Sequence, residues 1–234
     1  MRILVAASFG TTPTSFAGDE GTYVGLLESM ESRETFIQWG SGFSLQLYPA
    51  SRAFIWPAFV LNSLQLDPFY ALRLVAIIYA LGVFVLALAV IVFARWRSVD
   101  DKETNIPLVS NQSLALALLL LWPSLNAWYV VGLKESTSQF WILATFAALV
   151  ATMSATRWSL RLTSVCVTAL SLAAVYQVRD YLATVVILTG IFAILGYALA
   201  GLQRRQFRPL SVVLPMTALL LGSILGVAVS APLT

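Results

Sequence analysis

Long apolar runs alternate with short polar turns through most of the chain, and they predict a bundle of membrane-crossing helices. Each run has about 20 residues, the length that an α-helix needs to cross a hydrocarbon core about 30 Å thick. Six such runs occur, at 69–94, 108–130, 135–154, 160–177, 182–202 and 210–230. The apolar segment 1–9 is too short to cross and carries no cleavage pattern, so we expect it to end a short N-terminal helix.

The segment 10–68 has a different pattern, and we expect it to lie outside the membrane core. It opens with a turn-rich stretch, continues into a helical pattern after Asp19, and then becomes rich in aromatic residues and prolines. Because prolines interrupt the apolar residues around 53–66, this part suits a helix lying in the outer interface. The alternative is a re-entrant or short spanning element at 53–66.

The composition agrees with a membrane protein. Of 234 residues, 59% are hydrophobic and 11% are charged, and the mean hydropathy is +0.84. Soluble domains carry about 45–50% apolar and about 25% charged residues. We therefore predict an all-α polytopic bundle of about six full spans and a short N-terminal helix. It forms one membrane domain over 1–234, with an extracytoplasmic loop at 10–68 and a transmembrane bundle at 69–230.

The composition also limits the chemistry. No histidine is present, which excludes histidine-based acid-base catalysis and histidine-ligated metal sites. The single cysteine, Cys166, has no partner for an internal disulfide. Carboxylates, Lys, Arg and Tyr therefore remain as the reactive groups.

Basic residues between the spans predict the orientation. Three loops separated by two spans each carry most of them, so these loops lie on one side of the membrane with the N-terminus. Cytoplasmic loops carry an excess of Lys and Arg, which identifies that side as the cytoplasm. The residues are Arg2, Arg95, Arg97, Lys102, Arg157, Arg161, Arg204, Arg205 and Arg208. We expect an integral protein of a bacterial inner membrane, with its N-terminus in the cytoplasm and its C-terminus outside.

A few charged residues lie at span ends beside apolar sequence. They are Arg73, the pair Lys134-Glu135 and the pair Arg179-Asp180. Charges at membrane depth are costly and tend to face a bundle interior or an aqueous cavity, which makes them candidates for function. The alternative is that the bases extend to the interface and that each adjacent acid neutralises its neighbour.

Two adjacent acids, Asp19 and Glu20, mark the start of the helical pattern in the outer loop. The Asp19 carboxylate can cap the start of a helix, and this structural role is as well supported as a chemical one. Adjacent acids without a spaced third ligand are a weak signal for a metal, so we expect no metal site and no cofactor, with a divalent cation as the less favoured alternative.

Several short motifs occur in a characteristic order along about residues 1–200. An Asp-Glu pair and then a tyrosine open the outer loop, a Tyr-Pro pair precedes the aromatic helix, and ALRL opens the next span. Later, LWPSLNAWYVVGLKESTSQFW places Lys-Glu before a helix, and VYQVRDYLA carries an arginine-tyrosine turn. The residues are Asp19, Glu20, Tyr23, Tyr48, Pro49, Ala71–Leu74, Lys134, Glu135, Arg179 and Tyr181. In this order they resemble the GT-C membrane glycosyltransferases, most of all the bacterial relatives of protein O-mannosyltransferases and of the enzyme that adds aminoarabinose to lipid A.

The resemblance implies transfer of a sugar from a polyprenyl-phosphate carrier to an acceptor on the outer membrane face. Asp19 then matches the general base and Glu20 its acidic neighbour. Lys134 and Arg179 would bind the donor phosphate, and Arg52 or Arg73 would add positive charge. The other substrate-binding candidates are Tyr23, Tyr48, Glu135 and Tyr181. The implied partners are membrane lipid and the polyprenyl-phosphate sugar, with no nucleic acid.

The chain also departs from the family pattern. Family members are usually considerably longer, and here Leu47-Tyr48-Pro49-Ala50 replaces the usual basic residue and paired prolines. This predicts a short or truncated member, or one that a protein partner completes. The alternatives are an inactive glycosyltransferase fragment and a non-catalytic subunit that binds or moves a lipid-phosphate carrier. A transporter is disfavoured because no acid lies in mid-span and no inverted repeat is evident.

Overall fold

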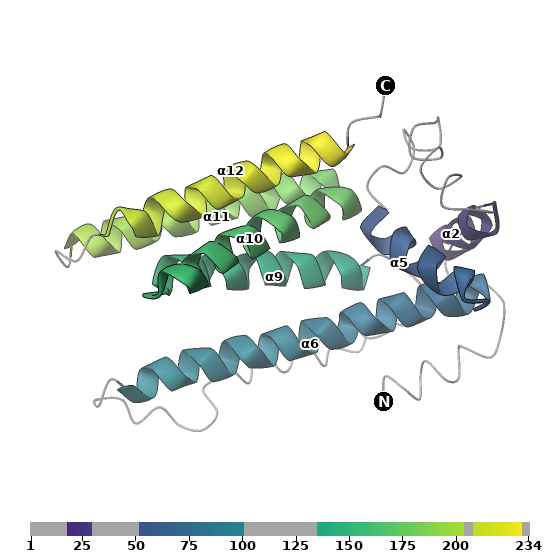
Figure 1. The fold of residues 1–234 in the computed structure, drawn as a ribbon, viewed down its shortest axis with the longest axis horizontal. Coiled ribbons are helices and arrows are strands. Elements are labelled where there is room, and N and C mark those ends of the chain that lie inside the picture. The colour runs from purple at the N-terminus through teal and green to yellow at the C-terminus, as the bar shows by residue number, and fades with distance from the viewer. Residues whose placement is uncertain (1–17, 30–51, 101–134, 204–207, 231–234) are drawn as a thin grey trace. The chain divides into compact units, whose positions relative to one another are not determined.

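The computed structural model describes residues 18–29, 52–100, 135–203 and 208–230. This part of the chain is helical and contains no strand (Figure 1). Its seven helices are α2 (Gly18–Ser29), α5 (Arg52–Ser63), α6 (Pro68–Asp100), α9 (Glu135–Ser154), α10 (Trp158–Val178), α11 (Asp180–Gln203) and α12 (Leu210–Ser230). The predicted all-α class is confirmed.

Five of these helices, α6, α9, α10, α11 and α12, are long and apolar enough to cross a membrane. They match five of the six predicted spans, four of them to within two residues at each end. The sixth predicted span, 108–130, and the N-terminal segment 1–9 lie outside the described residues, so the count of six spans and the N-terminal helix stay predictions. The structure is compatible with an integral membrane protein.

The lengths of α5 and α6 can be compared with the predicted span boundaries. The 33 residues of α6 extend about 50 Å, which exceeds the hydrocarbon thickness and carries the helix past the predicted end at residue 94. Neither Gly nor Pro interrupts its charged last turns, so nothing in the sequence stops it there. The 12 residues of α5 extend about 18 Å, which is too short to cross. Whether α5 lies in the interface stays a prediction.

The described chain divides into two compact units, which we consider separately. The first contains α2, α5 from Ile55, α6, and α9 as far as Phe140. In this unit α2 packs on α6, and α2 buries Tyr23, Val24 and Leu27 on one face. These two units do not correspond to the predicted outer loop at 10–68 and transmembrane bundle at 69–230, and that division stays a prediction.

A close approach between α6 and the start of α9 also belongs to the first unit. The Phe140 ring lies 5.4 Å from the Tyr79 ring, measured between centroids, at an angle of 57°. A Cβ atom added to Gly82 would lie 2.7 Å from two atoms of the Phe140 ring. Gly82 is therefore the position at which α6 makes room for the aromatic side chain of α9.

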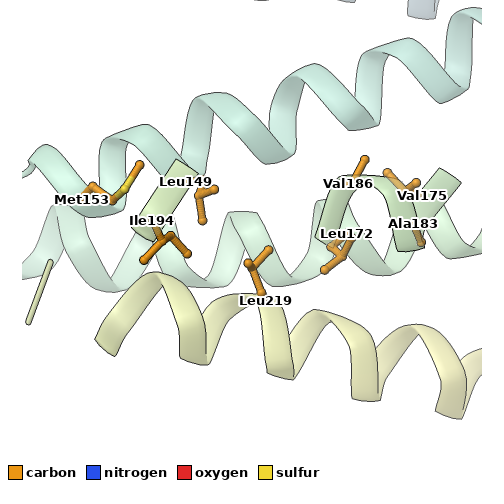
Figure 2. Close-up of a cluster of buried hydrophobic side chains, with 8 residues drawn as sticks. All are labelled: Leu149, Met153, Leu172, Val175, Ala183, Val186, Ile194 and Leu219. Carbon is orange, nitrogen blue, oxygen red and sulfur yellow. The ribbon is translucent and has the colours of Figure 1, made fainter. Parts of the chain in front are cut away.

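The second unit contains the first three residues of α5, α9 from Trp141, and α10, α11 and α12. From α9 to α12, each helix runs opposite to the one before it (Figure 1). All four helices contribute to one buried apolar cluster (Figure 2). Its members are Leu149 and Met153 of α9, Leu172 and Val175 of α10, Ala183, Val186 and Ile194 of α11, and Leu219 of α12. This cluster is the core of the unit.

The most extensive helix–helix contact in the second unit is between α10 and α12. The contact face of α12 carries residues with small or compact side chains, including Gly222 and Gly226. A Cβ atom on Gly222 would lie 2.9 Å from both the Ala169 carbonyl oxygen and Leu172 Cβ, and one on Gly226 would collide with the Tyr176 ring. Small residues spaced four apart let two helix backbones approach, as is common between membrane helices.

Large apolar side chains cover much of the outside of this unit. On α11 they include Val185, Leu188, Phe192 and Leu195, of which Phe192 is 71% exposed. Water would disfavour so continuous an apolar surface, whereas lipid tails would not. This exposure is what a helix on the lipid-facing side of a bundle requires.

Candidate functional site

The structure describes the side chains of half of the ten sequence-predicted site residues. Tyr48 and Lys134 lie outside the described residues. For Asp19, Glu20 and Arg52 only the position in a helix is described: the first two lie in the first turn of α2, and Arg52 is the first residue of α5. Tyr23, Arg73 and Glu135 belong to the first unit, and Arg179 and Tyr181 to the second.

Arg179 is the single residue between α10 and α11. Its backbone is extended, with φ −158° and ψ 108°. This non-helical conformation separates the end of α10 from the start of α11. Its N–H donates to the Val175 carbonyl at 2.8 Å, and its own carbonyl accepts from the N–H groups of Leu182 at 3.1 Å and Ala183 at 3.3 Å. The backbone of Arg179 therefore satisfies groups at both helix ends and holds the junction in one conformation.

The side chains at this junction are brought together as well. Arg179 Nη1 donates a 2.6 Å hydrogen bond to Tyr181 Oη, and the guanidinium carbon lies 5.9 Å from the centroid of the same ring. Arg179 is half-buried, whereas Tyr181 is exposed. The hydroxyl and the ring of Tyr181 thus restrict the orientation of the guanidinium, using one of its five N–H donors.

Asp180 has a local role in the described structure. Its Oδ1 atom accepts a 2.8 Å hydrogen bond from the Tyr181 backbone N–H. Asp180 is also the first residue of α11, where a carboxylate interacts favourably with the positive end of the helix dipole. The Asp180 carboxylate therefore occupies the N-terminus of α11, and the oriented Arg179 guanidinium is the group at this junction that could bind an oxyanion such as phosphate.

Arg73 and Tyr23 are both buried in the first unit. Arg73, in the second turn of α6, is 4% exposed, and its guanidinium carbon lies 5.6 Å from the centroid of the Phe69 ring. Tyr23 is 2% exposed, on the helix that packs on α6. Arg73 is therefore enclosed by protein and does not extend from the surface.

Sequence reasoning missed a polar turn at the start of α9. Glu135 is its first residue, and the next three, Ser136, Thr137 and Ser138, are all buried. Ser136 Oγ and Thr137 Oγ1 are inaccessible and make no hydrogen bond in the described structure. The signal that could have found them is three consecutive hydroxyl residues at the head of a helix that is otherwise largely apolar.

Arg161 is another residue whose role the sequence did not reveal. It was assigned to a cytoplasmic basic loop, yet it lies within α10 and is 8% exposed. Its Nε atom donates a 2.6 Å hydrogen bond to the carbonyl oxygen of Ala155, the residue that follows α9. Arg161 therefore connects the end of one helix to the beginning of the next.

In the residues that the structure describes, no three acidic or cysteine side chains lie close enough together to hold a metal ion. The expectation that the chain needs no cofactor stays a prediction.

Comparisons with known proteins add no family to this geometry. The chain matches no protein-family model, no curated protein and no solved structure.

Proposed function

We propose that the protein transfers a sugar from a polyprenyl-phosphate donor to an acceptor at the outer face of a bacterial inner membrane. The observation that carries the proposal is the contact between Arg179 and Tyr181 at the α10–α11 junction. A guanidinium held in one orientation at the end of two membrane-length helices suits a lipid phosphate, whose charged group lies at that depth.

Phosphate binding is assigned to Arg179 together with Lys134. Arg179 offers paired N–H donors to two phosphate oxygens, and Lys134 adds a point charge. Tyr181 keeps the guanidinium in place through its hydroxyl. Arg73, which is buried, and Arg52, the first residue of α5, are further sources of positive charge. Tyr23, Tyr48 and Glu135 complete the proposed substrate-binding set.

The membrane side of this site follows from the two ends of α10. Arg157 and Arg161 lie at the N-terminal end of α10, and Arg179 follows its C-terminal end. The 21 residues of the helix separate the two ends by about 32 Å. Because the basic loops are assigned to the cytoplasm, Arg179 is assigned to the outside. The same rule places the N-terminus inside and the C-terminus outside.

The reaction balances without a metal or a cofactor. An acceptor hydroxyl oxygen forms a bond to the anomeric carbon, and the bond from that carbon to the phosphate oxygen breaks. The electron pair leaves with the phosphate as polyprenyl phosphate, which the cations stabilise. The proton of the hydroxyl passes to the Asp19 carboxylate, with Glu20 beside it.

The test measures release of polyprenyl phosphate from a panel of hexosyl and pentosyl polyprenyl phosphates by the full chain in proteoliposomes made with bacterial lipids. Asp19→Asn is the informative variant, because Asn has nearly the same size and shape as Asp but cannot accept the proton. We expect the rate of release to fall at least about 100-fold, the usual contribution of general base catalysis. Glu28→Gln, which changes an exposed acid of the same helix, is the control and leaves the rate unchanged.

Two outcomes would contradict the assignment. Unchanged release by Asp19→Asn would remove Asp19 as the base. Binding of the donors without release of polyprenyl phosphate by any protein would favour the alternative, a non-catalytic subunit that binds or moves a lipid-phosphate carrier. The Arg179–Tyr181 contact serves that alternative too, since it requires only a phosphate.

A further inference from the structure

The first turn of α9 is polar and enclosed. Ser136 and Thr137 are 0% exposed, and Ser138 is 5% exposed. Successive residues of an α-helix are about 100° apart, so three buried neighbours show that protein surrounds more than half of the helix circumference at this end. A polar turn that is buried on several sides needs hydrogen-bond partners.

Threonine hydroxyls farther along α9 donate hydrogen bonds to backbone carbonyls of the same helix. Thr145 Oγ1 donates to the Trp141 carbonyl at 2.7 Å, and Thr152 Oγ1 donates to the Ala148 carbonyl at 2.9 Å, in each case four residues back. Ser136 and Thr137 lie in the first turn, where the residues four back precede the helix. Their hydroxyl oxygens, Oγ and Oγ1, are buried and make no hydrogen bond in the described part of the chain.

The geometry of a helix start inclines these two side chains toward the N-terminal end of α9. The Cα–Cβ bonds of a helix tilt toward its N-terminus, so the side chains of the first turn lean toward the end of the helix. The N–H groups of the first turn have no partner within the helix, and the helix dipole places partial positive charge there. Two buried hydroxyl donors thus join a helix end that already favours negative charge.

We infer that the first turn of α9 binds an oxyanion through the hydroxyls of Ser136 and Thr137. The inference rests on the proposed function in naming that oxyanion as the phosphate of the lipid donor. Glu135 opposes an anion mainly on its own side of the helix, because Thr137 lies about 200° around the axis from it and Ser136 about 100°. Ser136 and Thr137 therefore act as substrate-binding residues that the sequence did not identify.

The experiment measures dissociation constants by calorimetry for the full chain in lipid nanodiscs. The probes are farnesyl phosphate, farnesol, which lacks the phosphate, and inorganic phosphate, which lacks the lipid. The test variant is Ser136→Ala/Thr137→Val, with Ser136→Ala alone as a milder second variant. The control is Thr145→Val in the same helix, which removes a buried hydroxyl that bonds to a carbonyl instead.

We expect the wild type to bind farnesyl phosphate and not farnesol. The double variant should weaken that binding at least tenfold, because hydrogen bonds to a charged group are among the stronger ones. Ser136→Ala alone should weaken it severalfold, and Thr145→Val should leave it unchanged. Inorganic phosphate bound as tightly as farnesyl phosphate, with the same loss in the double variant, would keep the oxyanion site but assign it to a soluble anion.

Thermal unfolding without ligand shows whether the double variant is folded. We expect its midpoint temperature to equal or exceed that of the wild type, because no hydrogen bond within the protein is removed. A lower midpoint would mean that the fold itself uses these hydroxyls, and it would overturn the inference. Farnesol bound as tightly as farnesyl phosphate would also overturn it.

The outcomes separate this inference from the proposed function. Farnesyl phosphate binding that is equal in the wild type and the double variant overturns the inference alone and leaves sugar transfer to the Asp19 test. A wild type that binds no farnesyl phosphate overturns both.

Discussion

The Nε atom of Arg161 donates a 2.6 Å hydrogen bond to the carbonyl oxygen of Ala155, six residues earlier in the chain. Arg161 is 8% exposed and Ala155 is 5% exposed, so both groups are shielded. Ala155 follows the last residue of α9, where helix carbonyls lack partners within the helix. Arg161 thus stabilises the turn between α9 and α10 through hydrogen bonding as well as charge.

This contact predicts different effects for two uncharged substitutions. Gln has an amide nitrogen the same number of bonds from Cα as Arg Nε, so Arg161→Gln can still donate to Ala155. Arg161→Met has similar length and no donor, and it should lower the free energy of unfolding by about 1–3 kcal/mol relative to the Gln variant. Thermal or denaturant unfolding in detergent micelles measures the difference. Equal losses in both variants would show that charge, and not this bond, stabilises the turn.

A second prediction concerns the close packing of α12 on α10. Gly222→Ala places a Cβ atom 2.9 Å from the Ala169 carbonyl oxygen and from Leu172 Cβ, and neither atom can move without shifting α10. We expect a loss of about 1–3 kcal/mol in stability. Gly196→Ala in α11 is the matched control, because no atom lies within 4 Å of the added Cβ. It should be neutral or stabilising by up to about 1 kcal/mol, and a similar loss at both sites would contradict the packing argument.

A third prediction uses a double-mutant cycle at the contact between α6 and α9. Gly82→Ala should destabilise the protein because the added Cβ meets the Phe140 ring at 2.7 Å. Phe140→Leu should also destabilise it, since the aromatic contact with Tyr79 is worth about 0.5–1.5 kcal/mol. The two changes together should cost less than the sum of the single losses, because Leu leaves room for the new methyl group. Strict additivity would show that the two residues do not contact each other.

A fourth prediction tests whether Tyr181 positions Arg179. Tyr181→Phe keeps the ring beside the guanidinium but removes the hydroxyl that accepts the 2.6 Å hydrogen bond. On the proposed function, farnesyl phosphate should bind several times more weakly to this variant and at least tenfold more weakly to Arg179→Ala. Stability should change by less than about 1 kcal/mol, because Tyr181 is exposed. Unchanged binding in Arg179→Ala would remove the phosphate site from this junction.

A fifth prediction tests the orientation with two exposed residues, Arg157 just before α10 and Asp180 just after the turn that follows it. In a Cys166→Ala background, Asp180→Cys should react with a membrane-impermeant maleimide added to intact cells, and Arg157→Cys should react only after the membrane is opened. Both positions are exposed in the fold, so access depends on the membrane. The reverse pattern would overturn the assignment of the basic loops to the cytoplasm.

The predicted spans were accurate where the structure can be compared with them. The runs 135–154 and 210–230 coincide with α9 and α12, and Arg179 was predicted to lie in a turn. Such agreement is expected in a membrane protein, because a chain in lipid must satisfy its own backbone hydrogen bonds and a long apolar run therefore forms a helix. The sequence placed Arg179 and Tyr181 in the same turn motif. The hydrogen bond between their side chains could be found only from the three-dimensional structure.

The residues that sequence reasoning missed share a different property. Arg161 looks like any basic residue of a cytoplasmic loop, and Ser136 and Thr137 look like the polar edge of a span. Their burial depends on which other segments cover them, and no local pattern records that. The same holds for Gly222, whose role depends on the position of Ala169 in another helix.

By itself the sequence determined that this protein is helical and apolar enough for a membrane, because length and hydropathy along one segment decide whether that segment can cross a bilayer. It also identified the few charges that need explaining. Only the tertiary structure decided which polar groups are enclosed, which of them are satisfied within the chain, and where two helices touch through glycine. These properties arise from contacts between distant segments, and each depends on atoms that the local sequence does not contain.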